Sequence, residues 1–274
     1  MLDFIKHKLE KFNIDLVSCI SLRECRINRP YLLEKSGISD GSVIIFAVPY
    51  LSREATGKRN ISTYAVSRDY HIFFSSLFNE IIGDLKERFP NNKFAGFTDH
   101  SPIDEIEAAA KAGLGVIGHN HLLITRRYSS FVFLGEIITD SALPYCSGTV
   151  KHCIKCGKCL TACPVSGNSD KCLSALTQKK GELNADEKLL IKKSGCAWGC
   201  DICQQVCPYT LKAKNDGTIY TNIGFFNEYL TPLITSEDIK KMSDSDFKER
   251  AYSWRGKQTI TRNLKILEEK EDMP

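Results

Sequence analysis

The cysteine spacing between residues 153 and 207 constrains this chain more than any other feature of its sequence. Cys153, Cys156 and Cys159 are each separated by two residues, and Cys163 follows after three more, directly before Pro164. This spacing brings three thiolates to one 4Fe–4S cluster, while the fourth cysteine ligates a second cluster. The run therefore predicts iron–sulfur ligation. A zinc site, which also uses Cys-x2-Cys pairs, is the less specific alternative.

A second run supplies three cysteines where a full run has four. Cys200, Cys203 and Cys207 are spaced by two and three residues, and a proline again follows. The expected fourth position holds alanine. Cys196 is one residue away from it, and Cys172 could approach from a separate loop. The spacing leaves both candidates open.

Crossed ligation of the two runs, as in bacterial ferredoxins, predicts two ligand sets. The first cluster takes Cys153, Cys156, Cys159 and Cys207. The second takes Cys163, Cys200, Cys203 and one of the two candidates. We expect the remaining cysteines to be ordinary thiols, namely Cys19, Cys25 and Cys146.

The composition is that of a soluble globular chain, and we expect the protein to work in a reducing compartment. Of its 274 residues, 42% are hydrophobic and 26% are charged. No apolar run approaches the ~20 residues that a membrane span needs, and residues 1–12 lack the features of a signal peptide. Clustered cysteines without an export signal favour metal binding over disulfides. We expect a cytoplasmic protein with no membrane partner; the net charge of +4 is weak evidence for a nucleic-acid partner.

The hydrophobic pattern predicts a mixed α/β first half. Strands are expected near 14–20, 43–48, 94–97, 122–125 and 131–138. Long helices are expected over 2–12 and 69–89. A further helix is expected to begin with Ser101 as its N-cap and Pro102 at its first position, and to end at Gly113. Asp99 would then lie in a turn between a strand and a helix N-terminus, a common place for a functional side chain.

These elements predict an α+β fold of three consecutive parts. Residues 1–145 form the mixed α/β domain, residues 146–215 a ferredoxin-like domain with two 4Fe–4S clusters, and residues 216–274 a short helical extension. Within the last part, helices are expected near 236–242 and 244–252.

Several motifs outside the cysteine runs point to one family. They are Asp99-x2-Pro102-x2-Glu105, the segment Lys111–Asn120, Arg68-Asp69-Tyr70-His71, Phe133-Leu134-Gly135-Glu136, the block Gly199–Pro208 and Arg262-Asn263. Together they resemble the epoxyqueuosine reductase family over roughly residues 40–263. Plain ferredoxins would share only the cysteine runs.

The resemblance implies a reductase that binds cobalamin beside one of its two clusters. Members of the family reduce an epoxide on a tRNA nucleoside to an alkene in the last step of queuosine synthesis. The electrons would come from an external donor such as a flavodoxin or a ferredoxin-like protein. The family's proton donor matches Asp99, and a carboxyl group facing an apolar cofactor keeps its proton more readily. The alternative for Asp99 is a purely structural role in the turn.

The resemblance also implies the remaining site residues. The family's cysteine after the first run matches Cys172, which favours Cys172 over Cys196 as the missing ligand. Positions that contact cobalamin match Ser174, Cys200 and Asp201 by residue. Two further positions, matched through their backbone, are Leu123 and Leu134.

Three departures from the family pattern bear on the substrate. Ile106 stands where the family has arginine, and His119 where it has lysine. The chain resembles a short member or a paralogue without the C-terminal helical repeats, so the substrate would be tRNA or a smaller related nucleoside. The alternative function is a two-cluster electron carrier without substrate chemistry of its own.

Overall fold

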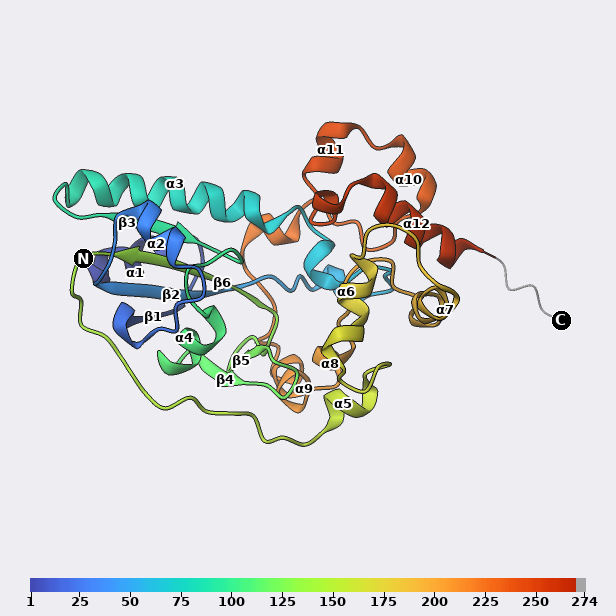
Figure 1. Ribbon diagram of the computed structural model, residues 1–274, viewed down its shortest axis with the longest axis horizontal. Helices are drawn as coiled ribbons and strands as arrows, with labels where there is room; N and C mark the ends of the chain where they lie inside the picture. The colour runs from blue at the N-terminus through green and yellow to red at the C-terminus, as the bar shows by residue number, and fades with distance from the viewer. Residues whose placement is uncertain (270–274) are drawn as a thin grey trace. The chain divides into compact units, whose positions relative to one another are not determined.

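The computed structural model describes residues 1–269, and their contacts form two compact units. Unit 1 comprises Met1–Tyr50, His71–Cys156 and Pro208–Ile223; unit 2 comprises Leu51–Tyr70, Gly157–Cys207 and the chain from Gly224 onward. Both are drawn in Figure 1. The three-part division by chain order stays a prediction, and its last five residues, 270–274, lie outside the described part. The expected α+β fold class is confirmed.

Unit 1 is built on a four-stranded antiparallel sheet. Its strand order is β1 (Leu16–Ser21), β2 (Ser42–Pro49), β6 (Val132–Thr139) and β3 (Phe94–Phe97). The apolar run of β2 is buried along its whole length, as a central strand requires. A separate hairpin pairs β4 (Gly115–Ile117) with β5 (Leu123–Thr125). The five expected strands are confirmed, whereas the three-residue β4 was too short to predict.

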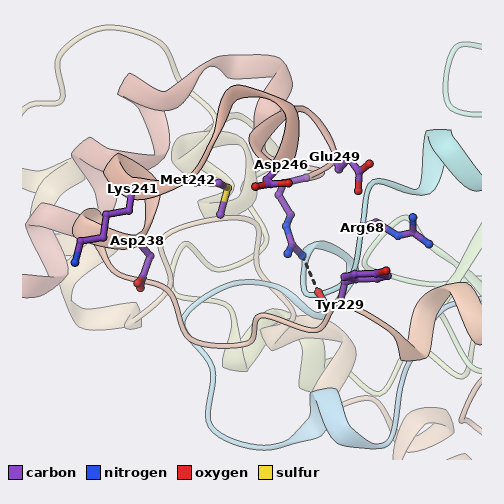
Figure 2. A pocket seen from close by; sticks show the side chains of 8 residues that line it. Arg68, Tyr229, Asp238, Lys241, Met242, Asp246 and Glu249 are labelled. Carbon is purple, nitrogen blue, oxygen red and sulfur yellow. Dashed lines mark hydrogen bonds between the residues drawn. The ribbon is translucent and has the colours of Figure 1, made fainter.

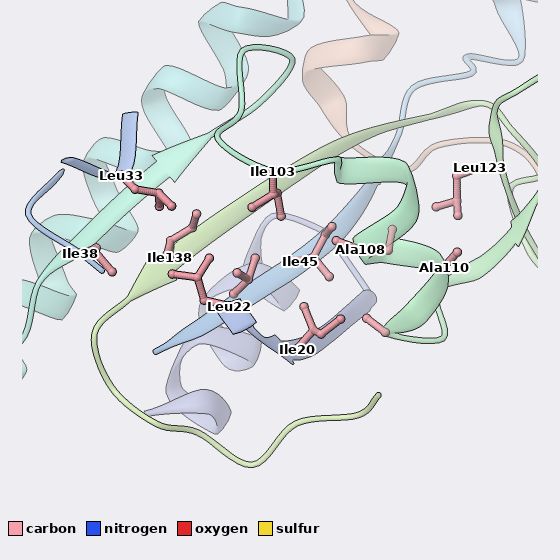
Figure 3. Packing of buried hydrophobic residues seen from close by; sticks show 13 residues of the cluster. Ile20, Leu22, Leu33, Ile38, Ile45, Ile103, Ala108, Ala110, Leu123 and Ile138 are labelled. Atoms are coloured by element: carbon pink, nitrogen blue, oxygen red, sulfur yellow. The ribbon is translucent and has the colours of Figure 1, made fainter. Parts of the chain in front are cut away.

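Alternation along β2 sends side chains to two different helices. On one face, the Phe46 ring stacks against Phe74 of α3 (Tyr70–Arg88) at 6.3 Å between centroids. On the other face, Ile45 packs with Ala108 of α4 (Glu105–Lys111). Figure 1 shows the two helices on opposite faces of the sheet, and Figure 3 shows the apolar cluster beneath α4.

Gly135 of β6 keeps the α3 face closely packed. A Cβ atom there would lie 2.4 Å from the Phe74 ring and 2.7 Å from Phe46. Real Cβ atoms do not approach other atoms so closely, so only glycine fits without moving an aromatic ring. This close approach gives the Phe133–Glu136 motif a packing role.

The predicted start of α4 is wrong. The helix begins at Glu105, and its N-cap is Asp104, whose side chain accepts the Glu107 N–H at 3.0 Å. Ser101 is instead fully buried, and its hydroxyl accepts the Ile103 N–H. An aspartate can cap as well as a serine, and the sequence offered both. At the other end, Gly113 follows the helix with φ +84°, as expected for a residue that terminates it.

The other helices of unit 1 border the sheet and the hairpin. They are α1 (Leu2–Lys11), α2 (Pro30–Ser36) and α9 (Pro208–Asn215). α1 was expected, whereas α2 and α9 were not. Among residues 1–269, no helix is both long enough and apolar enough to cross a membrane.

Unit 2 is formed by helices around two apolar clusters. Its helices are α5 (Lys158–Ala162), α6 (Leu173–Thr177), α7 (Ala185–Ser194), α8 (Ile202–Gln205), α10 (Ser236–Lys241), α11 (Asp244–Lys248) and α12 (Lys257–Glu268). The larger cluster surrounds the fully buried Trp198 and Tyr252. The smaller joins Leu173, Ile191 and Ile266. The expected helices near 236–242 and 244–252 are present; α12 was missed.

Candidate functional site

Asp99 occupies an exposed position with left-handed backbone geometry, two residues after the end of β3. Its φ is +61°, a conformation that aspartate tolerates better than most residues. Two-thirds of its side chain is exposed, and its Oδ2 lies 3.8 Å from Nε2 of His71 in the first turn of α3. Unit 1 therefore presents a carboxyl group and an imidazole together at the end of the sheet.

The loop around Asp99 is held by side chains on three elements. The Thr98 hydroxyl donates to the Leu134 carbonyl of β6 at 2.7 Å. The Asp99 N–H donates to Oε1 of Glu105 at 3.2 Å. His100 shares a 2.7 Å hydrogen bond with the Tyr31 hydroxyl of α2. These contacts fix the backbone while the Asp99 carboxyl faces outward.

The two backbone positions predicted for cofactor contact lie in strands of unit 1. Leu123 is buried in β5, and Leu134 is half-buried in β6. The Leu134 carbonyl already accepts a hydrogen bond from Thr98. A carbonyl oxygen can accept a second bond, so neither position is excluded.

The loop after β4 approaches the first cysteine run. The His119 N–H donates to Sγ of Cys153 at 3.3 Å, and the Cys153 N–H donates to the Ile117 carbonyl at 3.0 Å. Amide donors stabilise the negative charge of a cluster thiolate and tune its potential. The backbone of His119 makes this contact, so the replacement of the family's lysine does not affect it. Cys156 is exposed in the same unit.

In unit 2, two short helices carry cysteines of both runs. Cys159 lies on α5, Cys163 caps its end, and Cys203 lies on α8. α5 and α8 contact each other, which brings the two runs together within this unit. Cys207, two residues after the end of α8, is buried.

Those cysteines do not converge on one point. Within residues 1–269, no three His, Cys, Asp or Glu side chains are placed to hold a single metal ion. A single tetrahedral zinc would need its sulfurs at one centre, whereas each thiolate of a 4Fe–4S cluster binds a different iron. Cysteine thiolates without a histidine fit a 4Fe–4S cluster, and they also fit a four-cysteine zinc site.

Cys172 lies at the start of α6, against the segment that carries Cys200. The next residue, Leu173, shares an apolar cluster with Cys200 and Ile202. At the other end of α6, the Thr177 hydroxyl accepts the Gly199 N–H at 2.9 Å. Burial raises the pKa of the Cys200 thiol to about 12, so iron must displace its proton for it to bind as a thiolate.

Asn263 of α12 connects α6 to the segment that carries Cys200. It is fully buried, and its side-chain amide donates to the carbonyls of Thr177 and Ala197 at 2.6 and 2.8 Å. The neighbouring Arg262 donates to the Asn263 side-chain oxygen and to the Lys179 carbonyl. The Arg262-Asn263 motif therefore holds the Cys172 helix against the Cys200 turn.

Gly199 and Cys196 shape that turn. Gly199 has φ +70°, and a Cβ atom there would lie 2.5 Å from the Ser62 side chain, so no other residue fits. The Cys196 thiol donates to the carbonyls of Trp198 and Gly199, both at 3.3 Å. Burial raises the pKa of this thiol to about 11. Cys196 thus supports the turn, which agrees with the choice of Cys172 as the ligand.

The Asp201 side chain is engaged inside unit 2. It is buried and accepts hydrogen bonds from the Ser62 hydroxyl, the Thr63 N–H at 2.8 Å and the Arg59 guanidinium at 3.1 Å. Its predicted cofactor contact would therefore have to come from its backbone. Ser174, on α6, is half-buried, and its hydroxyl lies 3.3 Å from the Gln178 amide.

Two pockets lie within unit 2. One, of about 320 Å³, is bordered by Arg59, Cys196, Cys200 and Asp201. The other, of about 400 Å³, is shown in Figure 2, where Arg250 donates to the Tyr229 carbonyl at 2.8 Å. The acidic and basic side chains around this second pocket are equal in number, so it has no excess of positive charge. They are Arg68, Asp238, Lys241, Asp246, Glu249 and Arg250.

Comparison with known proteins agrees with this geometry. A family model described as "4Fe-4S double cluster binding domain" matches residues 152–210. A second, described as "Epoxyqueuosine reductase QueG, DUF1730", matches residues 38–100, which end just after Asp99. An epoxyqueuosine reductase of Gloeobacter violaceus is 33% identical over 222 residues, covering 75% of this chain and 68% of that protein.

The chain belongs to the epoxyqueuosine reductase family. It is therefore an oxidoreductase with a 4Fe–4S cluster-binding region. The epoxyqueuosine reductase of Lactococcus garvieae is 29% identical over 250 residues, covering 85% of this chain and 70% of that protein. The solved epoxyqueuosine reductase of Streptococcus thermophilus superimposes with a TM-score of 0.76 at 25% identity, covering 97% of this chain and 80% of that one.

A further solved relative is described with a tRNA stem loop. An epoxyqueuosine reductase with an epoxyqueuosine-modified tRNA stem loop has a TM-score of 0.76 at 23% identity, covering 97% of this chain and 80% of that one. At this identity it shows that the fold is shared.

Sequence reasoning missed the residues that surround the predicted ones. His71 faces Asp99, Glu105 binds its backbone, and Arg59 pairs with Asp201. His71 and Glu105 stand inside motifs that the sequence had already singled out, which was the available signal. Nothing in the sequence pointed to Arg59, because it lies 142 residues from its partner.

Proposed function

We propose that this protein is a cobalamin-dependent reductase that removes the epoxide oxygen of epoxyqueuosine, in tRNA or in a smaller related nucleoside. Two electrons and two protons convert the epoxide to an alkene and water. Both carbon–oxygen bonds break, and a carbon–carbon double bond forms. Family membership supports the reaction, and the solved relative with a tRNA stem loop supports tRNA as the substrate.

The Asp99 loop is the single observation that carries this proposal. An electron carrier needs no exposed carboxyl on a strained loop, yet unit 1 fixes this loop through Thr98 and Glu105 and places His71 beside the acid. A solved Bacillus subtilis epoxyqueuosine reductase, 22% identical with a TM-score of 0.72, is described with the loop of its catalytic aspartate swung out of the active site. In this proposal, Asp99 donates a proton to the departing oxygen.

Two 4Fe–4S clusters are proposed as the electron path. Cys153, Cys156, Cys159 and Cys207 would hold one cluster. Cys163, Cys172, Cys200 and Cys203 would hold the other. The amide of His119 near Cys153 and the contact of α5 with α8 support these sets. A flavodoxin or a ferredoxin-like protein would supply electrons, and we expect the protein to act in the cytoplasm.

Bound cobalamin would supply a low-potential metal centre that delivers electrons to the substrate carbon. The residues proposed to hold it are Asp99, Leu123, Leu134, Ser174, Cys200 and Asp201. Cys200 and Asp201 border the 320 Å³ pocket of unit 2, which has room for part of such a cofactor.

The test is an anaerobic turnover assay with cobalamin and a strong reductant. We expect the alkene product from epoxyqueuosine in tRNA, from the free nucleoside, or from both. Reduction of the clusters without any product from either substrate would favour the electron carrier instead.

A further inference from the structure

Glu136 is a buried acid that the proposed reaction leaves unused. It is fully buried in β6 and pairs with Ile45 across the sheet, so it faces the same apolar side as Ile45. An ionised carboxylate in such surroundings is costly unless donors or cations reach it. Among residues 1–269, none donates a hydrogen bond of ordinary geometry to either carboxyl oxygen of Glu136.

Glu105 meets Glu136 from the helix that covers this face. Glu105 is the first residue of α4, and the two carboxyl groups interact directly. Burial raises the pKa of Glu105 to about 7. Burial, and then the neighbouring Glu105, raise the pKa of Glu136 well above its usual value. Two carboxylates in one buried place cannot both ionise cheaply. A single proton between them supplies the donor that Glu136 lacks.

The other polar groups around the pair do not replace that proton. The Asp99 carboxylate raises the pKa of Glu105, while the hydrogen bond from the Asp99 backbone and, more weakly, Arg29 lower it. The Ser101 hydroxyl favours the charged form of Glu136. The nearby Cys25 thiol stays neutral, because burial raises its pKa to about 12. Arg29 is the cation that lowers the pKa of Glu105, and its guanidinium already donates to the Ser101 carbonyl at 2.9 Å.

The pair is connected to the Asp99 loop at both ends. Phe97, the last residue of β3, pairs with Glu136 in the sheet. Two residues later, the Asp99 N–H donates to Oε1 of Glu105 at 3.2 Å. The Asp99 loop therefore leaves the sheet beside the Glu136 carboxyl and is held by a hydrogen bond to the Glu105 carboxyl.

We propose that Glu105 and Glu136 share one proton, and that Glu105 of this pair is the positioning residue that holds the Asp99 loop for proton donation. The positioning role rests on the proposed function of Asp99; the shared proton does not. Glu105 acts through the Asp99 backbone rather than on the substrate. The shared proton lets Glu105 lie partly buried while its Oε1 remains an acceptor for that backbone.

Unfolding at different pH values tests the shared proton. Because both pKa values are raised in the folded state, the pair stabilises the fold fully below about pH 4.5 and loses this contribution as the pH rises through about 7. In Glu136→Gln, the amide donates to Glu105 without needing a proton. Between pH 5 and pH 8, the melting temperature of the wild type should therefore fall by about 5 °C relative to this variant.

The control for this measurement is Glu34→Gln, an exposed glutamate on α2 of the same unit. Its melting temperature should follow the wild type at every pH. All proteins are compared as the full chain, reconstituted anaerobically. Parallel curves for the wild type and Glu136→Gln would overturn the shared proton.

Turnover tests the positioning role. Glu105→Ala removes the acceptor for the Asp99 N–H and should lower kcat about 10- to 100-fold, with KM changed less than about twofold. Glu105→Gln keeps an acceptor oxygen and should recover most of kcat. Glu105→Asp keeps the charge but shortens the reach, so it should behave like the alanine variant even if that variant fails to fold.

Equal turnover in the wild type and Glu105→Asp, or equal loss in Glu105→Gln and Glu105→Asp, would overturn the positioning role. An inactive wild type would instead count against the proposed function. The unfolding comparison would still decide whether the two carboxyl groups share a proton.

Discussion

The Asp99 loop of unit 1 and the Cys200 turn of unit 2 are held in opposite ways. The Asp99 carboxyl is exposed, and the hydrogen bonds of its loop include one to the partly buried acid Glu105. The Cys200 turn is buried and held by Asn263, Thr177 and the thiol of Cys196. These three groups are all neutral.

This difference matches what each region has to do. A cluster ligand must not move between oxidation states, and a dense neutral network gives it a pH-independent position. A proton donor has to meet solvent and substrate in turn, so an exposed side chain is suited to it. Changes in the first region should affect cofactor content and stability, and changes in the second should affect turnover.

The largest effect is expected at Asp99. Asp99→Asn keeps the size and shape of the side chain but cannot donate an acidic proton, so kcat should fall by about 10²- to 10⁴-fold. Iron content and cobalamin binding should match the wild type, as measured by metal analysis and absorbance. Unchanged turnover would reject Asp99 as the proton donor. The Asp99 loop and the Cys200 turn would then no longer differ in function as described above.

The next effect concerns the ligand sets. The wild type should bind about eight irons after anaerobic reconstitution. Cys172→Ala should bind about four, because one cluster loses a ligand. Cys196→Ala is the matched control and should keep the full amount, since its thiol only supports the turn. The reverse pattern would make Cys196 the ligand in place of Cys172. Zinc in place of iron would reject the two-cluster proposal.

A smaller effect, on stability alone, is expected at Asn263. Asn263→Ala leaves the buried carbonyls of Thr177 and Ala197 without their donor. The free energy of unfolding should fall by about 2–4 kcal/mol in urea titrations. Gln258→Ala, at an exposed position of the same helix, should stay within about 0.5 kcal/mol of the wild type. Equal losses in both would mean that the Asn263 bonds do not secure the turn.

The smallest effect is expected at His71. Its contact with Asp99 is long, at 3.8 Å, and both side chains are more than half exposed. An exposed pair contributes little, so His71→Asn should lower kcat at most about fivefold. A loss as large as that of Asp99→Asn would show that His71 takes part in the proton transfer itself.

The fold was predictable where the signal was local. The apolar run of β2 and the periodicity of α3 each specified an element without help from elsewhere. The start of α4 could not be predicted, because Ser101 and Asp104 are both good N-caps and only tertiary contacts bury the serine. α12 was missed because its buried face, including Asn263, is recognised only once its partners are known.

The candidate site shows the same division. Motifs pointed to Asp99 and to the cysteines, since their spacing along the chain carries the chemistry. The partners of these residues come from distant segments: Arg59 and Ser62 reach Asp201, and Glu136 reaches Glu105. Such pairs depend on strand register and helix placement, which no local pattern encodes.

The most direct test of the account is one anaerobic assay of the full chain with cobalamin, a strong reductant and epoxyqueuosine, supplied both in tRNA and as the free nucleoside. The account predicts the alkene nucleoside as product, only when cobalamin and reductant are both present, and its loss in Asp99→Asn. Clusters that are reduced and reoxidised while both substrates remain intact would contradict it.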